Sequence, residues 1–309
     1  MKTYNLSTSG YVLPIVLFLV IILTGGGVFA LHIAKQEIAN TADLFDTAEA
    51  ELEAESQLEI VKFYAASGHF TLNYIENTAL LNGPVTYPEK LYIDGRDQNV
   101  TKTLAVRLQD TAGMLNAMYP DAQAITDLLA VDGDFGYSDT IRDSIADWFD
   151  KDDLHRLNGA EEAYYQQRKF PFSPRNVPIS LYRDELRLIH GLHELTNEQW
   201  DYVNRFLILS PVSAFNYTTA PPELLAAKLH VSVKELAGLT DLREKDIYLF
   251  LNRIREIGTG YNPETTNTFP SGVIAVEILS QRNNAQVTLH AILDCNDYDD
   301  APVHTISRY

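Results

Sequence analysis

The chain has 309 residues, of which 46% are hydrophobic and 21% are charged, so it can bury the core of one large or two smaller domains. Acidic residues outnumber basic ones by 42 to 24, and the resulting net charge of −18 disfavours binding to nucleic acid or to an anionic lipid surface. Cys295 is the single cysteine, which excludes an internal disulfide. We expect this thiol to be a small residue on a strand.

The first predicted element is a long helix that begins in an apolar segment. Residues 11–34 carry no Asp, Glu, Lys or Arg and are almost continuously apolar, and about 20 such residues suffice to cross a bilayer. Residues 35–67 interleave acidic side chains with apolar ones at helical spacing. The pattern predicts one helix over residues 11–67, apolar in a membrane and amphipathic outside it. Three consecutive glycines, Gly25–Gly27, should weaken this helix locally.

The ten residues that precede the apolar segment resemble the leader peptide of a prepilin. They are polar and end in Gly10, which is followed by the aromatic Tyr11, whereas a cleavable secretory signal has a shorter apolar region. The resemblance implies cleavage after Gly10 by prepilin peptidase and methylation of Tyr11. The fifth residue after this site is Ile15, where most pilins carry a glutamate that neutralises the N-terminal amine of a neighbouring subunit. A subunit without that carboxylate can lack a neighbour on one side, as at the tip of a filament.

Strand-like sequence follows this helix and returns at the C-terminus. Residues 68–110 contain segments rich in β-branched and aromatic side chains. Near the C-terminus, VIAVEILS and VTLHAILDCN alternate in polarity and are joined by QRNNAQ, which predicts a hairpin, and APVHTISRY is a candidate edge strand. We therefore assign residues 68–110 and 261–309 to one β-sheet domain.

Residues 111–260, between the two groups of strands, are mostly helical in pattern. Thr196, Thr219 and Ser232 are predicted N-caps, and Pro222 suits an early helical position. The order of elements predicts an α+β fold in which the long N-terminal helix packs on an antiparallel sheet. Residues 111–260 would form a large all-α domain inserted between the strands.

The richest cluster of carboxylates lies in this helical block. Hard cations such as calcium take about six to eight oxygen ligands of this kind. The spacing does not match an EF-hand, because Leu154 and His155 stand at the fifth and sixth loop positions. A second short loop, residues 132–139, places carboxylates two residues apart beside glycines. Spacing alone leaves open a calcium site and a solvated acidic face for the larger cluster, which comprises Asp143, Asp147, Asp150, Asp152, Asp153, Glu161 and Glu162.

Other motifs in the block do not indicate catalysis. The segment HGLHE at residues 190–194 matches neither zinc-binding helix motif, and Gly191 is a poor interior residue for a helix, so we interpret it as a helix end and loop. Gly113 reads as an ordinary turn residue. The sequence contains no nucleophile elbow, P-loop or dinucleotide fingerprint, and we expect no enzyme activity. A membrane-anchored, metal-dependent periplasmic hydrolase stays open as an alternative, although the sequence shows no catalytic base.

Several short segments occur in the order typical of one family. QDTAGMLN at 109–116 is similar to its D-x-x-G-x-x-N-x-N segment, in which Met118 replaces the last Asn, and ADWFDKDD at 146–153 with GAEEAYY at 159–165 resembles its D-W-I-D-x-D and G-A-E-x-x-Y-Y signature. Together with the anchor, the ordered set resembles the K-type minor pseudopilin of type II secretion systems (the general secretion pathway protein K family). The remaining segments are Asn176–Pro178, Asp184–Leu188 with Gly191, and Phe215–Pro221.

The resemblance implies a structural protein with a pilin-like fold. It would cross the bacterial inner membrane once, hold its globular part in the periplasm and cap the tip of the pseudopilus that serves protein export across the outer membrane. Implied partners are other minor pseudopilins in a tip complex, the major pseudopilin and prepilin peptidase. The family's helical insert binds calcium, and the matched positions imply as ligands Asp147, Asp150, Asp152, Glu161 and Glu162. A minor pilin of a type IV or related pilus has the same parts and stays open as an alternative.

Overall fold

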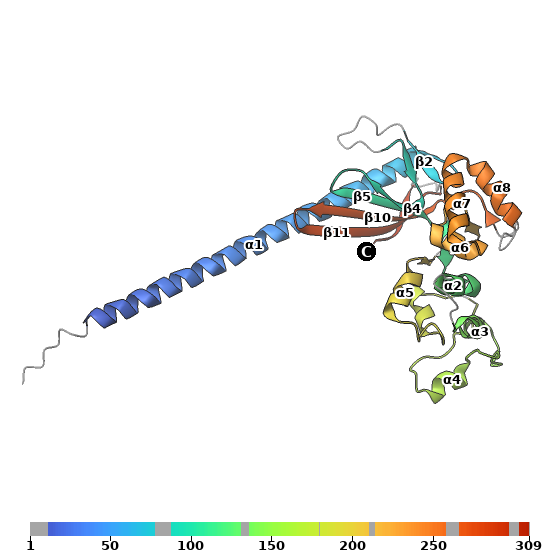
Figure 1. Cartoon of the computed structure of the whole chain (residues 1–309), viewed down its shortest axis with the longest axis horizontal. Helices are drawn as coiled ribbons and strands as arrows, with labels where there is room; N and C mark the ends of the chain where they lie inside the picture. The colour runs from blue at the N-terminus through green and yellow to red at the C-terminus, as the bar shows by residue number, and fades with distance from the viewer. Residues whose placement is uncertain are drawn as a thin grey trace, which may run out of the picture.

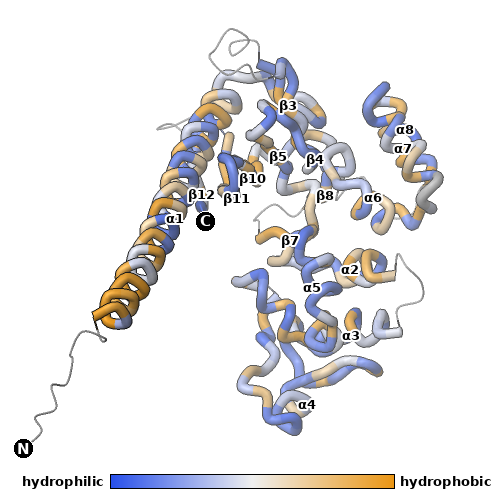
Figure 2. Tube along the Cα trace, turned by 60° about the vertical axis from the view of Figure 1, so that its left-hand side comes forward, coloured by the Kyte–Doolittle hydropathy of each residue, from blue (hydrophilic) through white to orange (hydrophobic). Residues whose placement is uncertain are grey.

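The longest element is α1 (Val12–Ser67), a continuous helix of 56 residues. The structure is a computed structural model that describes residues 12–77, 88–130, 136–178, 180–209, 214–257, 266–296 and 303–308. The N-terminal half of α1 projects away from the rest of the molecule and is strongly apolar (Figures 1 and 2). It is long and apolar enough to cross a membrane, and it is the one such helix among the described residues.

The glycines of α1 do not interrupt it. A Cβ added at any position of Gly25–Gly27 would meet nothing within 4 Å, and the helix continues through all three residues. Glycine costs an exposed helix about 0.5–1 kcal/mol per residue relative to alanine, and the long apolar run on both sides sustains the helix. The expected local weakening is therefore not visible as a break.

A five-stranded antiparallel sheet packs against the C-terminal half of α1 (Figure 1). Its middle pair joins a strand that precedes the helical block to one that follows it, so both groups of predicted strands belong to one sheet. Across the sheet the order is β12 (His304–Arg308), β11 (Ala285–Asp294), β10 (Val273–Arg282), β5 (Leu104–Asp110) and β4 (Asp94–Asn99).

The core between α1 and the sheet explains why these segments form a helix and strands. Burial alternates along β10, as expected for a strand with one face on a core. On α1 the buried side chains recur at helical spacing on one face. Each fully buried apolar side chain contributes about 1.5–3 kcal/mol. The members include Ala54, Leu58, Val61 and Tyr64 from α1 and Val106, Leu108, Ile274, Val276, Ile278 and Leu293 from the sheet.

The C-terminal hairpin and edge strand confirm two predictions. Strands β10 and β11 pair from Val273 with Asp294 to Arg282 with Ala285, so two asparagines form the turn. Asn283 has a φ of 47°, in the left-handed region that asparagine tolerates. Cys295 lies one residue beyond β11 and is half-buried, and burial raises the pKa of its thiol to about 12.

A smaller antiparallel sheet lies near the C-terminal end of α1. It consists of β1 (His69–Phe70), β2 (Tyr74–Glu76) and β3 (Lys90–Tyr92). Tyr64 of α1 donates hydrogen bonds from its hydroxyl to the carbonyls of Pro88 and Glu89, both at 2.8 Å. These contacts fix the end of the helix against the small sheet.

The helical block begins after β5 and forms two groups of helices around separate cores. The first group comprises α2 (Ala122–Leu129), α3 (Ser138–Phe149), α4 (Glu162–Gln167), a 3-10 helix at Arg183–Leu188 and α5 (Asn197–Asn204). The second comprises α6 (Pro222–Leu229), α7 (Val233–Lys245) and α8 (Ile247–Ile257). In Figures 1 and 2 both groups lie away from the apolar half of α1.

The block is not purely α-helical. Two short parallel strand pairs connect it: β6 (Leu115–Asn116) with β7 (Leu207–Ile208), and β8 (Phe215–Asn216) with β9 (Thr266–Asn267). These pairs bring together segments far apart in sequence, and two-residue strands are too short to show an alternating pattern. The prediction of an all-α insert is therefore correct for its main elements and incomplete for its connections.

Two of the three predicted helix caps are confirmed. Thr196 and Ser232 cap α5 and α7, each in a capping box with the residue three positions later. Thr219 does not cap α6, which begins at Pro222 after Pro221. Its hydroxyl instead donates a hydrogen bond to Asp110 Oδ2 at 2.9 Å.

The buried carboxylate of Asp110 joins the helical block to the sheet. This side chain is fully buried at the end of β5. It accepts hydrogen bonds from the hydroxyls of Thr219 and Ser271, at 2.9 and 2.6 Å, and from Asn216 Nδ2 at 3.2 Å. A Cβ at Gly113 would lie 2.7 Å from the Thr219 backbone, so this glycine is required for close packing and is not an ordinary turn residue.

Candidate metal centre

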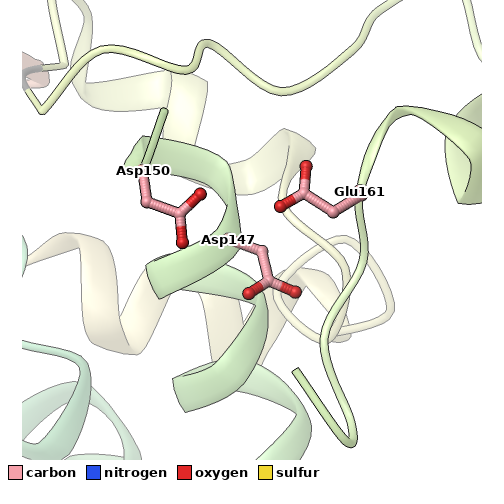
Figure 3. A group of neighbouring side chains, drawn as sticks. All are labelled: Asp147, Asp150 and Glu161. Atoms are coloured by element: carbon pink, nitrogen blue, oxygen red, sulfur yellow. The ribbon is translucent and has the colours of Figure 1, made fainter. Parts of the chain in front are cut away.

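Three carboxylates converge where the chain leaves α3 and returns to α4 (Figure 3). Asp147 lies in the last turn of α3, Asp150 caps its C-terminus and Glu161 directly precedes α4. One oxygen from each carboxylate lies within 4.8 Å of the others. Asp147 is fully buried and Glu161 is 4% exposed. This is the arrangement expected when hard oxygen ligands surround a cation.

Local packing forces the three side chains together. Trp148 of α3 and Tyr165 of α4 are buried against each other, with ring centroids 5.4 Å apart, and this contact holds the two helices together. Buried Ala160 anchors the returning chain beside them. A Cβ at Gly159 would lie 1.9 Å from Asp147 Oδ2, so only glycine lets the backbone pass this carboxylate.

Arg156 contacts two of the three carboxylates. Its NH1 lies 2.5 Å from Asp147 Oδ1 and 2.7 Å from Asp150 Oδ2, and its backbone N–H donates to Asp147 Oδ2 at 3.0 Å. Hydrogen bonds to both carboxylates raise the pKa of the guanidinium further. In the sequence, Arg156 is distinguished only as one of three basic residues, with Arg142 and Lys151, in or beside the acidic run.

Glu161 has no comparable partner among the described residues. Both of its carboxylate oxygens are buried without a hydrogen bond, as is Asp150 Oδ1. Burial, and then the charges of Asp147 and Asp150, raise the pKa of Glu161 to about 7. Leaving a buried carboxylate unpartnered is costly. The donor set, all carboxylate oxygens with three of them free, fits a hard divalent cation such as calcium.

The other predicted ligands make contacts elsewhere. Asp152 is exposed and accepts a hydrogen bond from the Leu154 N–H at 2.9 Å. Glu162 is exposed in the first turn of α4 and accepts from Gln166 Nε2 at 2.6 Å. The structure therefore brings together three of the five proposed ligands. Part of the second acidic loop, residues 132–135, lies outside the described residues.

The histidine segment is a loop, as predicted. Gly191 has a φ of +87°, which a regular helix excludes. The ring of His190 hydrogen-bonds through Nδ1 to the Tyr164 hydroxyl at 2.7 Å and to Glu194 at 3.0 Å. Its contacts are those of a packed polar side chain and do not indicate a metal ligand.

The predicted processing site, Gly10 and Tyr11, lies outside the described residues. Ile15 is the nearest residue of that argument that the structure describes, and it is exposed on α1. No acidic side chain occurs in α1 before Glu37.

Comparison with known protein families identifies the part of the chain that holds the site. Residues 106–212 match the family model described as type II secretion system (T2SS), protein K. This region of the chain is similar to the protein K family. It begins in β5, includes α2 to α5 and contains all three converging carboxylates. The match covers about a third of the chain.

The fold of this matched region and of its surroundings has a counterpart among solved structures. A chain in the crystal structure of the GspK–GspI–GspJ complex from the enterotoxigenic Escherichia coli type 2 secretion system aligns with a TM-score of 0.50 and 15% sequence identity. The alignment covers 89% of this chain and 98% of that chain, and at this identity it establishes a common fold alone. Comparison with curated protein sequences returns no match.

Proposed function

We propose that this chain is a minor pseudopilin that caps the tip of a type II secretion pseudopilus and promotes its assembly. The observation that carries the proposal is the combination of one exposed apolar helix with a protein K region in the same chain. The chain would be held in the bacterial inner membrane by α1, with the sheet and the helical block in the periplasm. Its role is structural and involves no catalysis.

The exposed face of α1 supports packing against other pseudopilin helices. Beyond the apolar segment, Ile38, Phe45 and Leu52 are spaced seven residues apart and are 67–70% exposed. Residues seven apart share one helix face, and this face lies opposite the one that carries Ala54 and Leu58 into the core. A second helix, from a minor or the major pseudopilin, would cover these side chains.

Two further features suit a position at the tip. Ile15 provides no carboxylate for the terminal amine of a subunit above it, if prepilin peptidase cleaves after Gly10. The helical block extends to the side of the sheet and away from the apolar half of α1 (Figures 1 and 2), where it would obstruct the addition of another subunit. Other minor pseudopilins would contact α1 on the side of the membrane and form the tip complex.

We further propose that the carboxylates of Asp147, Asp150 and Glu161 hold a calcium ion, with Asp152 or Glu162 or water completing the shell. Calcium would supply the positive charge that the free oxygens of Glu161 and Asp150 lack. Its effect would be to tie the segment between α3 and α4 to the end of α3.

The proposed function is tested by deleting the chain in its native host. We expect lower secretion, and pseudopili that are fewer or uncontrolled in length when the major pseudopilin is overproduced. Complementation with the full chain should restore both, and mass spectrometry should find methylated Tyr11 as its N-terminus. Normal secretion and normal pseudopili in the deletion strain would overturn the proposal.

A further inference from the structure

Arg156 takes the place at the carboxylate cluster that a bound cation would need. Its NH1 lies between Asp147 Oδ1 and Asp150 Oδ2, at 2.5 and 2.7 Å. Calcium binds carboxylate oxygens at about 2.3–2.6 Å. An ion that used these two oxygens would therefore occupy nearly the same position as the guanidinium nitrogen. Two cations cannot share that position, because they would overlap and repel each other.

Arg156 contacts only some of the carboxylate oxygens of the cluster. The guanidinium and the backbone N–H of Arg156 engage both oxygens of Asp147 and one of Asp150. Asp150 Oδ1 and both oxygens of Glu161 remain buried without a partner among the described residues. When all three carboxylates are ionised, the one guanidinium leaves two negative charges uncompensated at the cluster. A single positive side chain therefore fills part of a site whose charge suits a divalent ion.

We propose that Arg156 is a built-in competitor, which occupies the cluster in the cation-free protein and leaves it when a divalent cation binds. The inference rests on the proposed cation site and adds the residue that sets its affinity. Removing the guanidinium should tighten cation binding, because the ion would no longer have to displace it.

The segment that carries Arg156 can release the side chain at little structural cost. The Arg156 side chain is 44% exposed, and it leaves the core of the insert undisturbed because it is absent from that core. The neighbouring Leu154 and Leu157 are 79% and 93% exposed, so they hold the segment by few apolar contacts. Displacement would turn the guanidinium to solvent while Ala160 and Gly159 stay in place.

The competition has a consequence for the protein without calcium. With Arg156 in the cluster, both carboxylate oxygens of Asp147 accept hydrogen bonds. The guanidinium also neutralises part of the negative charge at the C-terminal end of α3. The insert should therefore stay folded when calcium is removed, and should bind calcium only above a concentration that the guanidinium sets.

The test is calcium titration of the full chain in detergent, by calorimetry and by melting temperature, with chelator-treated buffers. Arg156→Gln removes the charge and keeps much of the side-chain length. Arg142→Gln is the matched control, because Arg142 pairs with Asp139 on α3, outside the cluster. We expect Arg156→Gln to lower the Kd for calcium about tenfold or more and to lower the melting temperature only without calcium, with Arg142→Gln unchanged in affinity.

A readout on the unmodified chain avoids any effect of substitution on folding. Phenylglyoxal modifies accessible guanidinium groups, and mass spectrometry locates the modified residue. Calcium should increase modification of Arg156 and leave that of Arg142 unchanged.

The outcomes separate this inference from the proposed cation site. Calcium binding that is lost in Asp147→Asn but is unchanged or weaker in Arg156→Gln would overturn the competition and leave the site standing. Binding by Arg156→Gln but not by the unmodified chain would support the competition in its strongest form. Absence of binding in both would overturn the site and the competition together.

Discussion

At the scale of single residues, two carboxylates of the candidate site differ in the hydrogen bonds that they accept. Asp147 and Glu161 are both buried. Asp147 receives the guanidinium and a backbone N–H of Arg156, whereas Glu161 receives no hydrogen bond from the described residues. The unpaired carboxylate makes the arrangement a candidate for a ligand, because a cluster in which every oxygen were satisfied would be complete without one.

Glu161 should make the stability of the calcium-free protein depend on pH. Its pKa is about 7 in the folded chain, against an ordinary value of 4.5, so the folded state binds more protons than the unfolded state between these values. The free energy of unfolding should therefore fall as pH rises from about 5 to about 8, by about 1–3 kcal/mol. Urea denaturation at a series of pH values, with chelator present, measures this slope.

Glu161→Gln is the control for that slope. Glutamine has nearly the same shape and does not titrate, so the variant should lose most of the fall in stability and also its response to calcium. An identical slope in the variant and the unmodified chain would assign the pH dependence to other groups.

At the scale of elements, the sequence predicts what is periodic and misses what depends on distant partners. The long helix, the hairpin between β10 and β11 and the edge strand β12 follow from their own residue patterns. The parallel pairs β6–β7 and β8–β9 join segments about 50 to 90 residues apart, and no local pattern marks them. Thr219 shows the same limit, because its predicted capping role yields to a hydrogen bond with Asp110.

The site was predictable to a similar extent. The acidic spacing and the family resemblance point to the segment in which carboxylates gather, and three of the five named ligands converge there. The positions of the other two, Asp152 and Glu162, depend on the path of the loop, which the spacing of residues in the sequence does not define. The role of Arg156 depends on its contact with Asp147 across that loop, and the role of Gly159 depends on the close approach of Asp147, where a Cβ would clash. Neither is visible in the sequence, because both need the folded path of the loop.

Gly113→Ala should disrupt the packing between the helical block and the sheet. The new Cβ would lie 2.7 Å from backbone atoms of Thr219, and overpacking of this kind costs about 1–3 kcal/mol. Gly136→Ala is a matched control, because a Cβ there meets nothing within 4 Å. Thermal unfolding of the two variants should show a lower melting temperature for Gly113→Ala alone; equal melting temperatures would contradict the tight contact.

At the scale of the whole molecule, one helix serves two kinds of packing. The face of α1 with Ala54 and Leu58 completes the chain's own core, and the face with Phe45 and Leu52 is exposed. A soluble monomer would gain nothing from this exposed apolar face, and its position next to the apolar segment favours contacts with other helices. The stability of the chain and its assembly should therefore respond to different residues.

Phe45→Ala and Leu58→Ala test this separation. Phe45 is 67% exposed, so its loss should barely change the melting temperature but should reduce co-purification with other pseudopilins. Leu58 is 2% exposed, and its truncation should cost about 2–5 kcal/mol of stability. Loss of stability in Phe45→Ala, with intact co-purification, would contradict the assignment of this face to assembly.

The junction at Asp110 also determines how a load would travel through the molecule. The chain enters the helical block beside Thr111 and leaves it beside Ser271, whose hydroxyls lie 3.2 Å apart. A second link joins Arg243 of α7 to Asp94 of β4 at 3.3 Å. A push on the helical block would pass through these polar contacts into β5 and β4, then across β10 to α1. The carboxylate of Asp110 thus lies at the junction through which such a force would pass, and its hydrogen bonds resist shear between the helical block and the sheet.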